Sequence, residues 1–123
     1  MTGQHISGPH EVTAIEHWSS ARASVVAIDL QAAVQYDTYR LDSPDRIYLD
    51  LHDTKLSAGL KEKTIDVRDG LLGRIRVAQP ARGVTRVVLE TKGAPNFSIR
   101  MEQNPCRLLT EVLSPGTSPT PPR

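Results

Sequence analysis

The sequence has little of several residue types that mark particular protein classes. Cys106 is the only cysteine among 123 residues. The chain therefore cannot form an internal disulfide or a zinc site built on two or four cysteines. No stretch approaches the roughly 20 apolar residues of a membrane span, and the first ten residues lack the apolar centre of a signal peptide. Lysine and arginine (15) nearly balance aspartate and glutamate (14), which argues against a general nucleic-acid binder.

The two ends differ in composition from the rest of the chain. Residues 1–10 show no periodicity and are expected to be a loose leader. Residues 114–123 read SPGTSPTPPR, and such a proline-rich segment is expected to be a stiff, extended linker to a downstream domain. The remaining residues, 11–113, have the length of one ordinary domain.

Short runs of alternating apolar and polar residues dominate this body. Alternation with a period of two, bounded by Gly, Pro or Asp, is typical of half-buried strands. Four such runs lie at residues 25–30, 46–51, 74–77 and 86–90. Helix signals are weak: residues 56–63 suit one short turn, and Ile15 and Trp18 have helical spacing. The body is therefore predicted to be all-β.

An internal repeat is the most informative feature of the sequence. A shift of 61 residues aligns residues 25–51 with residues 86–112 without a gap. The identities are Val26 with Val87, Ala33 with Ala94, Pro44 with Pro105 and Arg46 with Arg107. Upstream the shift is 60 and pairs Ile15 with Ile75, so a strand at Ile75 argues for a strand at Ile15. This register predicts the duplication of one all-β unit.

Two such halves bury a core only together, because a small sheet with one apolar face needs a partner. Packing the apolar faces against each other gives a β-sandwich of two similar sheets with pseudo-two-fold symmetry. The alternate residues then form two outer faces. They include Asp29, Arg46, Tyr48, Asp50, Arg86, Glu90, Arg107 and Glu111. The matched positions of Arg46 and Arg107 predict two equivalent outer surfaces, and hence two ligand sites.

Two stretches resemble the signature motifs of the AMIN domain family. They are IRVAQPARGVTRVVLE at residues 75–90 and YRLDSPDRIYLDL at residues 39–51. In the family the motifs read approximately I-R-V-x-Q…T-R-V-V-[IL]-[DE] and L-x-[ND]-P-x-R-[IL]-x-[IL]-D-[IL]. The second proline turn departs from this pattern, so residues 104–112 resemble a degenerate copy. The resemblance covers nearly the whole body and implies a symmetric β-sandwich.

The resemblance also implies a function. AMIN domains precede the catalytic domains of periplasmic zinc-dependent N-acetylmuramoyl-L-alanine amidases, where they bind peptidoglycan and target the enzyme to the division septum. By resemblance, this chain is expected to be such a non-catalytic, periplasmic cell-wall module of an amidase in cell division, with divisome proteins as further partners. The alternative is a protein-interaction module of a type IV pilus secretin, with pilus-assembly proteins as partners. Neither implies a cofactor, a membrane span or nucleic acid.

Arginines are the main candidate ligand-binding residues. Arg74 and Arg76 share a strand face, Arg86 lies on a following strand, and Arg46 and Arg107 follow the two proline turns. Guanidinium groups in a row suit bidentate capture of carboxylates, which the stem peptides of peptidoglycan carry. The alternative is that these arginines pair with carboxylates across strands, or that Arg46 binds backbone carbonyls of its turn or Asp42.

Tyr48 and Asp50 complete the candidate set. The aromatic face of Tyr48 suits stacking on a sugar ring. The outward carboxylates named above are expected to form cross-strand pairs rather than the pair of carboxylates that a glycosidase needs. Trp18 is expected in the core or covering an edge. No H-E-x-x-H or G-x-S-x-G motif occurs, and the four histidines form no ligand pattern. No catalytic or metal-binding residue is therefore predicted.

Overall fold

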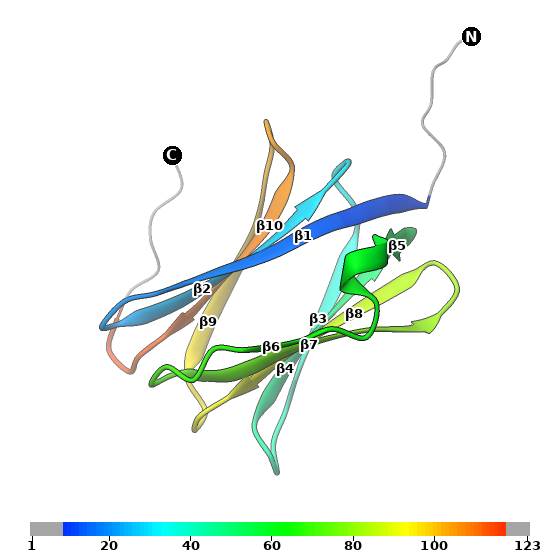
Figure 1. The fold of residues 1–123 in the computed structure, drawn as a ribbon. Coiled ribbons are helices and arrows are strands. Elements are labelled where there is room, and N and C mark those ends of the chain that lie inside the picture. Colours follow the sequence, from blue (N-terminus) through cyan, green and yellow to red (C-terminus); the bar gives the residue numbers. More distant parts are fainter. Residues whose placement is uncertain (1–8, 118–123) are drawn as a thin grey trace, which may run out of the picture.

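The computed structural model describes residues 9–117, whose strands form two five-stranded sheets stacked as two layers (Figure 1). Sheet A has the order β5–β1–β2–β10–β9 and sheet B the order β3–β4–β8–β7–β6. The elements are β1 (His10–Ser19), β2 (Ala23–Leu30), β3 (Tyr36–Leu41), β4 (Arg46–His52), β5 (Thr54–Leu56), the 3₁₀ helix η1 (Ala58–Leu60), β6 (Thr64–Asp66), β7 (Leu72–Ala81), β8 (Val84–Thr91), β9 (Asn96–Glu102) and β10 (Arg107–Leu113). The predicted leader and linker fall mostly on residues 1–8 and 118–123, which lie outside the described residues.

The predicted all-β sandwich is confirmed. The four alternating runs form β2, β4, β7 and β8. The repeat correctly favoured a strand over a helix at Ile15, which lies within β1 and pairs with Ile28 of β2. Residues 56–63 contain only the single turn η1. Alternation thus located the strands because one side of each strand faces the core.

The core lies between the two sheets and is built from the inward side chains of the alternating runs. Ile28, Ile47, Leu49, Ile75 and Leu89 are completely buried within it. Full burial of one such side chain contributes about 1.5–3 kcal/mol. The two layers are therefore held together mainly by apolar contact, and the outer faces are left to polar side chains.

The two sequence repeats are interleaved in the sheets. Each repeat gives a pair of adjacent strands to each layer: β1 and β2 join β10 and β9 in sheet A, and β3 and β4 join β8 and β7 in sheet B. The two repeats meet where β2 pairs with β10 and where β4 pairs with β8. The turns before β4 and β10 correspond closely, with Ser43 at φ 60° and Asn104 at φ 63°. The pseudo-symmetry therefore relates one sheet to the other across the core.

Asp69 links the two layers at one end. Its carboxylate accepts hydrogen bonds from the Ser19 hydroxyl of β1 (2.7 Å) and from the backbone amides of Leu71 (2.8 Å) and Leu72 (2.7 Å). Burial opposes the charged form of Asp69, but these hydrogen bonds outweigh it and lower the pKa of the carboxyl. The loop before β7 is thereby fixed to sheet A.

Candidate functional site

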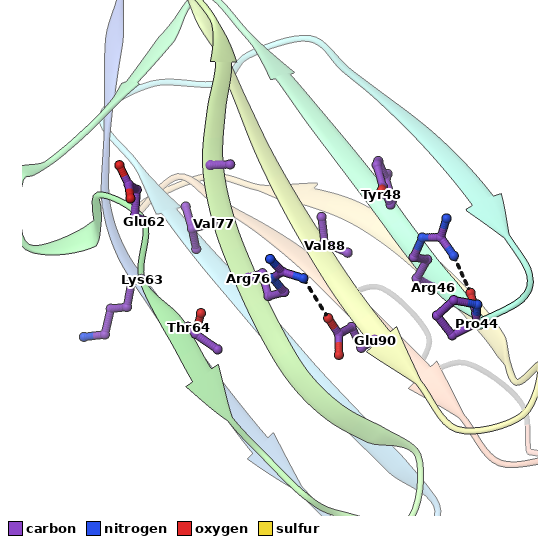
Figure 2. Close-up of a pocket in the computed structure, with 11 residues that line it drawn as sticks. Pro44, Arg46, Tyr48, Glu62, Lys63, Thr64, Arg76, Val77, Val88 and Glu90 are labelled. Atoms are coloured by element: carbon purple, nitrogen blue, oxygen red, sulfur yellow. Dashed lines mark hydrogen bonds and ion pairs between the residues drawn. The ribbon is translucent and has the colours of Figure 1, made fainter.

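A groove of about 530 Å³ crosses the outer face of sheet B (Figure 2). It runs from the turn before β4, over β4, β8 and β7, to the segment that leads into β6. Its lining includes Pro44, Arg46, Tyr48, Lys63, Thr64, Arg76, Val88 and Glu90. Its cations, Arg46, Lys63 and Arg76, outnumber its carboxylates, Glu62 and Glu90, and an apolar strip lies beside them, so this shallow site suits an extended, anionic ligand.

Among the described residues, Arg46 and Lys63 are the two cations of this groove that form no ion pair with a carboxylate, and Arg46 is the one that lies on the strands of sheet B. Its Nη1 donates to the carbonyl oxygen of Pro44 at 2.6 Å, and its guanidinium lies 5.8 Å from the centre of the Tyr48 ring. Within residues 9–117, no carboxylate oxygen lies within 4.0 Å of this guanidinium. The alternative reading from the sequence, a bond to a carbonyl of its own turn, is therefore observed. It leaves most of the five guanidinium donors available.

Arg74 and Arg76 both bind Glu90. Arg74 Nε lies 2.6 Å from Glu90 Oε1, and Arg76 Nη1 lies 3.4 Å from Glu90 Oε2. The hydrogen bond from Arg74 is the main reason that the pKa of Glu90 is lowered. Glu90 also stands directly opposite Arg46 in the pairing of β4 with β8. Because β7 holds this carboxylate, it forms no ion pair with Arg46.

Arg86 and Asp50 form a bidentate pair between β8 and β4. Arg86 Nε and Nη2 lie 2.9 Å and 3.0 Å from the two oxygens of Asp50. Asp50 points outward, yet it is only 7% exposed because the arginine covers it. The hydrogen bond to Asp50 is the main cause of the raised pKa of Arg86. The Arg86 guanidinium also lies 5.0 Å from the centre of the Tyr48 ring. Asp50 thus holds the arginine that lies over the tyrosine ring.

A second aromatic residue, Tyr39, lies beside this site and was missed in the sequence. It stands directly opposite Tyr48 in the pairing of β3 with β4 and is 48% exposed. The residues of β3 alternate weakly, so nothing in the sequence alone put Tyr39 on an outer face. Only the pairing register of β3 with β4, which sets Tyr39 opposite Tyr48, places the ring on the outer face. Together the two rings give sheet B an aromatic strip next to Arg46.

The outer face of sheet A is built differently. Arg107 lies 3.3 Å from Asp29 and 3.4 Å from Glu16, and its guanidinium lies 5.9 Å from the centre of the Trp18 ring. Trp18 is 49% exposed, so the expectation that it sits in the core was wrong. The pattern of β1 alone does not reveal this, because its register against β2 decides which side chains face outward.

The seven predicted ligand-binding residues are thus distributed unequally between the two sheets. Six lie together on the outer face of sheet B: Arg46, Tyr48, Asp50, Arg74, Arg76 and Arg86. Arg107 lies on sheet A. The prediction of equivalent surfaces was wrong, because the side chains around Arg46 and Arg107 differ in charge. The strand framework is repeated, but the chemistry on it is not.

The described residues offer no metal-binding group of three or more His, Cys, Asp or Glu side chains. In the same part of the chain, no helix is long and apolar enough to cross a membrane. The arrangement on sheet B can hold a carboxylate and an apolar or sugar ring side by side. It therefore has the properties of a binding surface.

Comparison with known families agrees with this description. The family model of the AMIN domain matches residues 14–110, which is well over half of the chain. That span begins in β1 and ends in β10, so it covers both sheets. No curated protein was found to match the chain. The chain therefore belongs to the AMIN domain family, whose members are non-catalytic peptidoglycan-binding and targeting modules.

Proposed function

We propose that this domain binds peptidoglycan through the outer face of sheet B and thereby holds a tethered N-acetylmuramoyl-L-alanine amidase on the cell wall. The protein acts in the periplasm, at the septum of dividing cells. The single observation that carries the choice of surface is the groove in which Arg46 has a backbone partner but no carboxylate partner within the described residues. A guanidinium in that state can take a carboxylate of the ligand without first breaking an ion pair.

The chemistry of the ligand matches the groove on two counts. Stem peptides carry carboxylates that Arg46 can bind, and the glycan offers rings that Tyr48 and Tyr39 can stack on. Arg86 and Asp50 act indirectly: Asp50 positions Arg86, whose guanidinium lies against the Tyr48 ring. Binding at each site is weak, because a shallow face buries little of the ligand. The polymer repeats the ligand, so avidity localises the attached enzyme.

Co-sedimentation with purified peptidoglycan sacculi tests the proposal. A charge-assisted hydrogen bond contributes about 1.5–3 kcal/mol, so Arg46→Ala should weaken pelleting by roughly ten- to a hundredfold. Arg22→Ala removes the same charge from the exposed turn between β1 and β2 and is the matched control. Binding of the wild type should also fall between low and moderate salt.

Two results would contradict the proposal at different levels. If the folded wild type does not pellet with sacculi, the domain does not bind the wall under these conditions and a protein partner becomes the better reading. If the wild type pellets and Arg46→Ala pellets equally well, wall binding stands but the surface is wrong. A fluorescent fusion of the domain that fails to collect at septa would contradict the cellular role.

A further inference from the structure

The surroundings of Arg46 and Arg107 can be compared position by position, because the repeat gives each the same set of five positions, the arginine itself and four neighbours. On sheet A these are Arg107, Asp29, Ala14, Glu16 and Glu102. On sheet B the matching residues are Arg46, Glu90, Arg74, Arg76 and Leu41. Within each set, the arginine on β10 or β4 stands directly opposite the first carboxylate. The two sets therefore share a backbone arrangement and differ only in side chains.

The set on sheet A is acidic. It holds three carboxylates and one arginine, a net charge of −2. Arg107 is bound by Asp29 at 3.3 Å and by Glu16 at 3.4 Å, and Glu102, directly opposite it on β9, is bound by Arg100 at 3.1 Å. An incoming carboxylate would have to displace two carboxylates that already bind this guanidinium, and the surplus negative charge opposes its approach.

The set on sheet B is basic. It holds three arginines and one carboxylate, a net charge of +2. Glu90 is occupied by Arg74 at 2.6 Å and Arg76 at 3.4 Å. On β3 an apolar side chain, Leu41, stands opposite Arg46 where sheet A has a glutamate. The surplus positive charge attracts an anion to the one guanidinium that lacks an ion pair in the set.

Most of the difference in charge lies on β1 and β7, not on the strands that carry Arg107 and Arg46; the exchange of Glu102 on β9 for Leu41 on β3 supplies the rest. Ala14 and Glu16 of β1 are replaced at the equivalent positions of β7 by Arg74 and Arg76. The glutamate adds a second carboxylate to Arg107, whereas the two arginines take the shared carboxylate, Glu90, away from Arg46. The charge on this neighbouring strand thus decides whether the central arginine is available.

We infer that the domain has a single anion-binding face, on sheet B, and that the arginines of β7 keep it open while the glutamate of β1 closes the equivalent site on sheet A. The identity of the ligand, a carboxylate-bearing peptide of the cell wall, rests on the proposed function. One chain therefore takes one stem peptide, despite the internal repeat. Arg74 and Arg76 are positioning residues that act through Glu90, and their own contact with ligand is not required.

Titration with a soluble disaccharide-tetrapeptide released from sacculi tests the stoichiometry, with backbone amide NMR shifts reporting the face. We expect one site, with shifts confined to sheet B and centred on β4 and β8. Arg46→Ala should abolish them, whereas Arg107→Ala, the matched control on sheet A, should leave them unchanged. Ala14→Arg combined with Glu16→Arg should add a second site, with new shifts on β2 and β10. Arg74→Ala combined with Arg76→Glu should weaken the first site at least tenfold.

The outcomes separate the inference from the proposed function. Two sites in the wild type, or equal losses in Arg46→Ala and Arg107→Ala, would overturn the inference and leave wall binding intact. No second site in the folded β1 variant would overturn the role of β1. If the wild type binds neither this muropeptide nor sacculi, the proposed function fails and the inference fails with it. Circular dichroism of each variant confirms that a loss is not due to unfolding, and Arg46→Lys provides a milder change of the same group.

Discussion

Replacing Arg86 by alanine should destabilise the fold strongly, although this side chain lies on an outer face. The change would leave the carboxylate of Asp50 buried without its two hydrogen bonds of 2.9 Å and 3.0 Å. Removing one member of a buried pair costs about 3–5 kcal/mol. The Arg86 side chain is 35% exposed, so water reaches the pair and the lower end applies, about 3 kcal/mol. For a domain of this size that lowers Tm by roughly 10 °C or more.

Urea unfolding followed by circular dichroism measures this effect. Arg74→Ala is the matched control, because Arg74 is half-exposed and Glu90 keeps Arg76 as a partner. It should cost under about 1 kcal/mol. A double-mutant cycle with Asp50→Ala should show that the two changes together cost about 2 kcal/mol less than their sum. Equal losses in Arg86→Ala and Arg74→Ala, or an additive cycle, would refute the reasoning.

Three further predictions concern the core, the response to pH and the aromatic strip. Thr110→Val should raise the free energy of unfolding by about 1 kcal/mol in urea titrations, because the buried Thr110 hydroxyl has no partner among the described residues. Stability should fall as the pH drops below about 4.5. The folded-state pKa values of Asp69 and Glu90 are lowered, so the unfolded chain takes up these protons first; Asp69→Asn should make urea midpoints less sensitive to acid. Tyr39→Ala should reduce pelleting with sacculi severalfold and change stability by under about 1 kcal/mol, since the ring is 48% exposed; unchanged pelleting would exclude this ring from the site.

The sequence was sufficient for the parts of the fold that follow from local alternation. Runs such as residues 86–90 show which side chains face the core, since burial on one face imposes a period of two. The repeat then placed Ile15 on a strand where its own spacing was ambiguous. The candidate arginines could also be found, because each lies on the outward side of a recognisable strand or directly follows a proline turn.

The pairing of those arginines could not be predicted in the same way. Glu90 stands opposite both Arg74 and Arg46, and only the strand order β4–β8–β7 reveals that both compete for it. Such an order depends on contacts between distant segments, which alternation does not encode. The same applies to Trp18, whose exposure follows from the register of β1 on β2. Sequence reasoning therefore identified the charged residues but not which of them are neutralised.

The interleaving of the repeats also determines when the domain can finish folding. Sheet A is completed by pairing β2 with β10, and Asp29 meets Arg107 across 78 positions of the chain. Such distant pairing requires closure of a long loop, which makes folding slow compared with a helical bundle. On the ribosome, β2 has to wait for nearly the whole domain to be synthesised before its second neighbour emerges. A nascent chain that stops before β10 therefore exposes one edge of β2, and neither repeat can close the sandwich alone.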